Sequence, residues 1–133
     1  MRPRENAELL LRKAKQDEFT LEKLVPDPAS PDEVLGFHAQ QAIEKTLKAV
    51  LALASVRYRF THDLVELLDL LRENKISFPP QFEEARTLTP FAAAIRYGDL
   101  PAEPEEPFDR SWALGCVRQV RAWAEGIFRE RTG

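Results

Sequence analysis

Apolar residues recur at intervals of three and four positions along most of the chain, and no long segment alternates strictly between apolar and polar residues. This spacing is typical of amphipathic helices and argues against β-strands. The fold class is therefore all-α: a single domain, residues 1–133, folded as an up-and-down antiparallel four-helix bundle with an additional short helical segment. We predict helices over residues 3–25, from about 31 to 54, 61 to 74, 78 to 97 and 108 to 130.

Several residues mark where these helices begin and end. Ser30 is predicted to cap the second helix, with Glu33 completing a capping box, and Thr61 is predicted to cap the third. Asn74 is expected to end the third helix. Pro90 lies inside the fourth apolar pattern, and it should kink or break that helix because proline has no backbone N–H.

The second predicted helix is apolar around most of its circumference, which predicts that it packs on more than one side at the centre of the bundle. Gln40 and Glu44 lie at the edge of its apolar arc. The opposite face is polar and carries His38, Gln41, Lys45 and Lys48.

This polar face has two interpretations. With two lysines about one turn apart, it could line a binding site for a phosphate or nucleotide. Alternatively, it is the solvated side of an amphipathic helix, since long charged side chains are usually exposed.

A second candidate is His62, at the start of the third predicted helix. A histidine there could bind an anion or act as a base, or it could simply fix the preceding turn. Arg57 precedes it at a spacing that could serve metal-free RNA cleavage, with the histidine moving a proton and the arginine stabilising the phosphorane. That spacing alone is common by chance, and we interpret the pair as coincidence.

A third candidate is the pair Arg96 and Tyr97, at the end of the fourth predicted helix. Such a pair could clamp a phosphate and stack on a base. Equally, Arg96 could pair with an acid of the loop over residues 98–109, which carries five acidic and no basic residues, while Tyr97 closes the core.

Composition narrows the possible chemistry. The net charge is -3, so no global basic field attracts nucleic acid. Cys116 is the one cysteine of the chain, so an internal disulfide is excluded. One cysteine and two histidines form no recognisable metal site, and we expect no cofactor. We expect Cys116 to be inert packing on the last helix. No apolar run approaches the length of a membrane span, and we expect a cytoplasmic protein.

An ordered set of short motifs resembles the HEPN domain family. These are the block from Gln40 to Ala49, the run Thr61-His62-Asp63-Leu64, and Arg96-Tyr97. The resemblance spans Ala7 to Phe128 and implies an antiparallel helical bundle, commonly a homodimer. It also implies a possible partner, because many bacterial members are encoded beside a minimal nucleotidyltransferase, and some such pairs are toxin and antitoxin.

Active members of the family are metal-independent ribonucleases that carry an arginine, four to six residues, and then a histidine. Arg96 matches that arginine, but Pro101, Ala102 and Glu103 occupy the positions where the histidine should fall. We therefore expect a nucleotide-binding, RNA-binding or nucleotidyltransferase-partner module with a degenerate ribonuclease motif. The ligand would bind through Arg96, Tyr97, His62 and the polar face of the second helix. The alternatives are an active ribonuclease toxin using Arg96 and His62, and a dimeric scaffold without ligand.

Overall fold

The computed structural model describes residues 2–92 and 108–132. These residues form helices and connections and contain no strand, which confirms the all-α fold class. The elements are α1 (Pro3–Leu24), α2 (Asp32–Leu53), α3 (Leu64–Glu73), the 3-10 helix η1 (Pro80–Leu88) and α5 (Arg110–Thr132).

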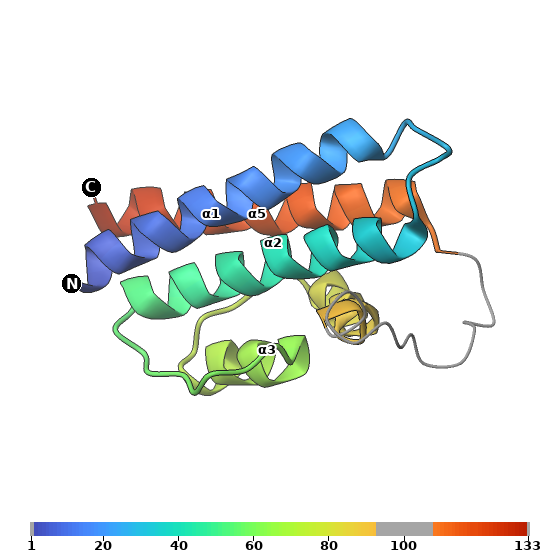
Figure 1. The fold of residues 1–133 in the computed structure, drawn as a ribbon. Helices are drawn as coiled ribbons and strands as arrows, with labels where there is room; N and C mark the ends of the chain where they lie inside the picture. Colours follow the sequence, from blue (N-terminus) through green and yellow to red (C-terminus); the bar gives the residue numbers. More distant parts are fainter. Residues whose placement is uncertain (1, 93–107, 133) are drawn as a thin grey trace.

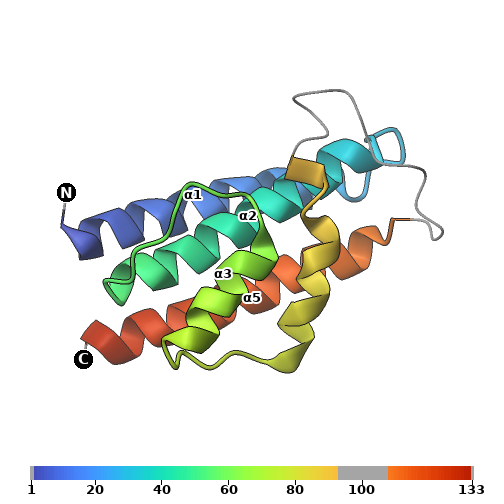
Figure 2. The same cartoon turned by 90° about the horizontal axis from the view of Figure 1, so that it is seen from below.

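The three long helices α1, α2 and α5 lie side by side, and α1 runs in the opposite direction to the other two (Figure 1). The shorter α3 and η1 lie on the other side of α2, which is clear when the molecule is seen from below (Figure 2). Consequently α2 contacts each of the other elements, and the prediction that it is the central helix is confirmed.

The core forms where the apolar stripes of these helices meet. In α3, Leu64, Leu67, Leu68 and Leu71 follow helical spacing and are all buried in the common core. Burying one leucine side chain stabilises a fold by roughly 1.5–3 kcal/mol, so this stripe fixes α3 to the bundle despite its ten residues. The connection after α3 is held to α5 by Trp123, whose indole N–H donates to the carbonyl of Ser77 at 3.0 Å.

The predicted capping box at Ser30 is wrong. Helix α2 begins at Asp32, its N-cap is Pro31, and no side chain caps it. Instead, Arg110 of α5 donates to the carbonyl of Ser30 and to the carboxylate of Asp32. A residue of a distant helix, Arg110, therefore holds the turn between α1 and α2. Ser30 is buried within that turn.

The predicted cap at Thr61 is displaced by two residues. The N-cap of α3 is Asp63, whose carboxylate accepts from the backbone N–H of Val65 at 3.0 Å. Thr61 accepts from the N–H of Asp63 at 3.1 Å and so shapes the approach to the helix. His62 thus lies before α3 and not in its first turn.

The break predicted at Pro90 is confirmed, because η1 ends at Leu88, a turn follows, and helix resumes at Phe91. The segment before the break is a 3-10 helix and not the α-helix that its apolar spacing predicted. None of the helices formed by residues 2–92 and 108–132 is long and apolar enough to cross a membrane.

Candidate functional site

A buried polar ridge runs along α2. Gln40, Glu44 and Lys48 are spaced four residues apart, so their side chains lie one above another on the same side of the helix. All three are buried, with exposed fractions of 0, 4 and 7%. Buried polar and charged groups persist only when they are hydrogen-bonded or paired, so each of these side chains needs a partner.

The connection between α2 and α3 supplies those partners. It leaves α2 through Ser55, which has a positive φ of 59°, and then runs back past the helix to Asp63. Tyr58, Phe60 and His62 alternate along it and meet the ridge. The ammonium group of Lys48 lies 5.6 Å from the ring centre of Tyr58 and 5.7 Å from that of Phe60, within the range of cation–π attraction.

Glu44 is the centre of this cluster. Its Oε1 accepts from Nε2 of Gln40 and from Nδ1 of His62, each at 2.8 Å. Its Oε2 accepts from Nζ of Lys48 at 3.0 Å. Gln40 also donates to the backbone carbonyl of His62 at 3.0 Å, so His62 is held through both its ring and its backbone.

The bond to Glu44 defines which ring nitrogen of His62 is available. A carboxylate only accepts, so Nδ1 carries the proton of that bond and Nε2 is left for another group. The side chain of His62 is 32% exposed, and the ring of Phe60 meets it edge-on at 5.2 Å between centres. This arrangement could move a proton or bind an anion at the surface.

The electrostatics of the cluster also affect Tyr58. Burial raises the pKa of the Tyr58 hydroxyl, and the nearby charge of Glu44 raises it further, against a hydrogen bond from Asn6 that lowers it. The phenol is therefore neutral at physiological pH and available as a hydrogen-bond donor.

The remaining polar residues of α2 belong to a second cluster, centred on Asp17 of α1. One oxygen of Asp17 lies 3.1 Å from Nδ1 of His38, and the other lies 2.6 Å from Nζ of Lys45. The predicted polar face is thus divided: His38 and Lys45 tie α2 to α1, whereas Lys48 joins Glu44 beside His62. Gln41 donates to the side-chain oxygen of Gln40 at 2.7 Å.

Arg96, Tyr97 and residues 98–107 of the acidic loop lie outside the described residues. The loop's last residue, Asp109, accepts from the backbone N–H of Trp112 at 2.9 Å and caps α5. Arg57 is exposed on the connection after α2, where it lines a surface hollow with Tyr58.

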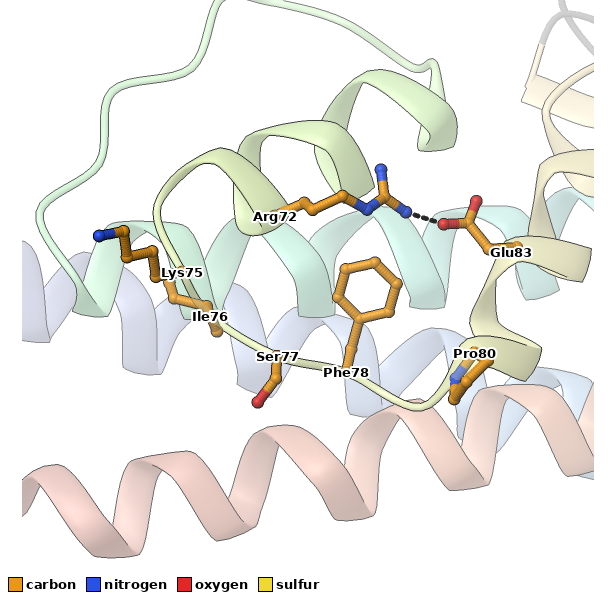
Figure 3. Close-up of a pocket in the computed structure, with 7 residues that line it drawn as sticks. All are labelled: Arg72, Lys75, Ile76, Ser77, Phe78, Pro80 and Glu83. Carbon is orange, nitrogen blue, oxygen red and sulfur yellow. Dashed lines mark hydrogen bonds and ion pairs between the residues drawn. The ribbon is translucent and has the colours of Figure 1, made fainter.

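A separate pocket of about 450 Å³ lies where α3 ends and the chain turns into η1 (Figure 3). Arg72 of α3 reaches across it to form an ion pair with Glu83 of η1, and its guanidinium group lies 5.3 Å from the ring centre of Phe78. Because Arg72 also pairs with Asp69, its donors are engaged within the chain, and this contact serves to hold η1 against α3. Nothing in the sequence pattern pointed to this pocket.

The fold and these clusters define an all-α bundle whose central helix is tied by charged and hydrogen-bonded side chains to the segments that precede and follow it in the chain. Comparison with protein-family models matches the HEPN domain over residues 7–127. The chain therefore belongs to the HEPN domain family, as its motifs indicated. Searches of curated proteins and of solved structures returned no significant match.

Proposed function

We propose that this HEPN chain is a non-catalytic binding module that forms a homodimer and pairs with a minimal nucleotidyltransferase in a toxin–antitoxin type system. The observation that carries the proposal is the missing histidine: Pro101, Ala102 and Glu103 follow Arg96 where the family's catalytic histidine would fall. Without an imidazole there, the motif lacks its group for moving a proton during RNA cleavage.

The two histidines of the chain have contacts that suit structural roles. His38 binds Asp17 and so joins α2 to α1, and His62 binds Glu44 and so joins the connection to α2. Truncating either would leave a carboxylate with one partner fewer in a largely buried position, which is costly. These contacts account for both histidines without invoking catalysis.

Charge favours a protein partner over RNA at the predicted site. Lys45 is neutralised by Asp17 and Lys48 by Glu44, so neither ammonium group is available for a phosphate without breaking an internal ion pair. The chain also carries a net charge of -3, which opposes the approach of a polyanion.

One observation favours a second candidate, a metal-independent ribonuclease that uses Arg96 and His62. Glu44 fixes Nδ1 of His62 and leaves Nε2 for a substrate, and a carboxylate that orients an imidazole in this way is a common feature of acid–base sites. In that case Arg96 would stabilise the phosphate while His62 moves the proton.

A ribonuclease assay separates the two candidates. Wild type, Arg96→Ala and His62→Ala are incubated with a mixed-sequence RNA in EDTA, and cleavage is followed by gel. The proposal predicts no cleavage above the protein-free control by any of the three. Cleavage by wild type that is lost in both variants would overturn it and establish the enzyme.

The partner is tested by co-expression with the minimal nucleotidyltransferase encoded beside the gene. We expect the two proteins to co-elute in gel filtration, with the HEPN chain dimeric by light scattering. The lack of such a neighbouring gene, or separate elution of the two proteins, would refute the pairing. A mass of 15.2 kDa for the isolated chain would refute the dimer.

A further inference from the structure

The 3-10 helix η1 has one face fixed to the core and a neighbouring face that lies open. A 3-10 helix has three residues per turn, so positions three apart share a face. Phe82 and Ala85 are buried, and the ring of Phe82 meets that of Trp123 of α5 edge-on at 5.5 Å between centres. The neighbouring face carries Gln81 and Glu84, which are exposed.

A hollow of about 390 Å³ lies between this open face of η1 and one stripe of α5. It is lined by Gln81 and Glu84 from η1 and by Trp112, Gly115, Cys116 and Gln119 from α5. The residues of α5 recur at intervals of three or four positions, so they share one side of that helix. The volume of the hollow falls in the range of small-molecule sites, roughly 300–1,000 Å³.

The polar side chains around the hollow lack partners within the protein. Those of Gln81, Glu84 and Gln119 make no hydrogen bond or ion pair with any part of the chain that the structure describes. By contrast, the carboxylates of Glu18 and Glu83, which line other hollows, are each bound by an arginine. The acceptors of this hollow are therefore available to a ligand.

Gly115 leaves room in the hollow. A Cβ added at this position would meet nothing within 4 Å. Glycine inside a helix is destabilising relative to alanine, and no close packing at Gly115 offsets that cost. Positions that depart from local stability rules without such an offset are expected at functional sites. A longer side chain here would occupy the space that the hollow provides.

The charge of the lining favours a cation. Glu84 is its one charged side chain, whereas the pocket of Figure 3 contains Arg72 and Lys75, and the hollow between the start of α1 and the end of α2 contains Arg57. Burial and, to a smaller extent, the charge of Glu84 raise the pKa of the Cys116 thiol, so that charge acts inside the hollow. No basic side chain of the lining opposes a positively charged ligand.

We propose that this hollow binds an alkyl ammonium group. The ammonium nitrogen of a primary amine carries three N–H donors, which match the carboxylate of Glu84 and the amide oxygens of Gln81 and Gln119. The alkyl part packs against the half-buried indole of Trp112, whose face also attracts a cation. The hollow shares no residue with the family motif or with α2, so this site goes beyond the function proposed above.

The test titrates the full-length chain with n-butylamine at neutral pH and follows the two indole N–H signals by NMR, with the Trp112 signal assigned from Trp112→Phe. We expect a saturable shift of that signal with a Kd on the order of 1 mM. Butanol, which lacks the charge, and butyrate, which reverses it, should not bind. The ammonium can belong to a free amine or to a lysine of another protein. Tighter binding of cadaverine than of N-acetyl-lysine amide would identify the first source, and the reverse order the second.

Two matched pairs of variants locate the site. Glu84→Gln should weaken butylamine binding at least about tenfold, the scale of one charge-assisted hydrogen bond. Glu73→Gln removes an exposed carboxylate outside the lining and should have no effect. Gly115→Leu should abolish binding by filling the hollow, whereas Gly115→Ala should retain most of it. Both glycine variants should unfold at urea concentrations no lower than wild type, so a loss of binding cannot be attributed to unfolding.

Four results would overturn the proposal. They are the lack of a saturable shift at about 10 mM butylamine, an equal shift with butanol, equal losses in Glu84→Gln and Glu73→Gln, and binding that persists in Gly115→Leu. The ribonuclease and co-elution assays involve none of these residues, so failure of this site and failure of the proposed function are distinguishable.

Discussion

Removing the carboxylate of Glu44 should be among the most damaging single changes in this chain. Glu44 is buried and accepts three hydrogen bonds, from Gln40, His62 and Lys48. Glu44→Ala leaves the ammonium of Lys48, whose side chain is 9% exposed, without its counter-ion. Breaking a buried ion pair in this way costs about 3–5 kcal/mol, against a typical total stability of roughly 5–15 kcal/mol.

The chain provides a matched control. Arg4 and Glu8 form an ion pair with the same four-residue spacing, but their side chains are 44 and 51% exposed. Pairs of this kind contribute about 0.3–0.5 kcal/mol, so Glu8→Ala should be nearly neutral. In urea unfolding followed by circular dichroism, Glu44→Ala should lower the midpoint by about 2 M, given an m-value of about 2 kcal/mol per molar.

A double variant tests the cause. If the cost of Glu44→Ala comes from the stranded cation, then Glu44→Leu combined with Lys48→Met should recover much of the stability, because apolar residues of similar size often replace a buried pair at little cost. A loss below 1 kcal/mol in Glu44→Ala, equal to that of Glu8→Ala, would refute the buried cluster. No recovery in the double variant would mean that the hydrogen bonds to Gln40 and His62 dominate.

Three further predictions concern packing and ionisation. Gly36→Ala should destabilise the fold by about 1–3 kcal/mol, because its new Cβ would lie 2.3 Å from the ring of Phe91. Gly115→Ala in α5 meets nothing within 4 Å and should stabilise the fold by about 0.5–1 kcal/mol. The midpoints of urea unfolding check both predictions. Burial raises the pKa of the Cys116 thiol to about 11, and a nearby carboxylate contributes a smaller part of this rise. The thiol should therefore resist Ellman's reagent at pH 8 in the native protein and react fully in the unfolded protein. Because the pKa of Tyr58 is raised, the folded state holds the phenol proton more tightly than the unfolded state does. The protonated phenol therefore stabilises the fold below pH 10, and this stabilisation is lost as the pH rises through the pKa that Tyr58 has in the folded state. Absorbance at alkaline pH, with the chain's other tyrosine replaced by phenylalanine, measures that titration, and a pKa at or below 10 would contradict the burial of Tyr58.

Much of the fold could be predicted from the sequence because helical periodicity reports burial directly. The spacing of apolar residues in α2 and α3 predicted both helices, and the lack of N–H in Pro90 predicted the break after η1. The helix starts were less predictable, because they depend on distant residues. Ser30 matches a capping box locally, yet the turn is held by Arg110, which lies 80 residues further along the chain.

The candidate site was only partly predictable for a similar reason. A helical wheel gives the direction of a side chain but not what covers it, so Lys48 was grouped with His38 when it in fact pairs with Glu44. The four-residue spacing of Gln40, Glu44 and Lys48 was a usable signal for one ridge. What the sequence could not provide is that an irregular connection, and not another helix, covers that ridge.

The pairing of these cations leads to a last prediction, on the salt dependence of any oligonucleotide binding. For a single strand, the slope of log affinity against log salt is about -0.7 for each phosphate that the protein neutralises. The acids Asp17 and Glu44 already balance the lysines of α2, whereas Arg57 is unpaired among the described residues. Binding through Arg57 should therefore give a slope near -0.7 that vanishes in Arg57→Ala. A slope near -1.4, unchanged in that variant, would mean that both lysines of the α2 face engage phosphates. That result would require the internal ion pairs to open, and it would return the ligand to the residues around His62.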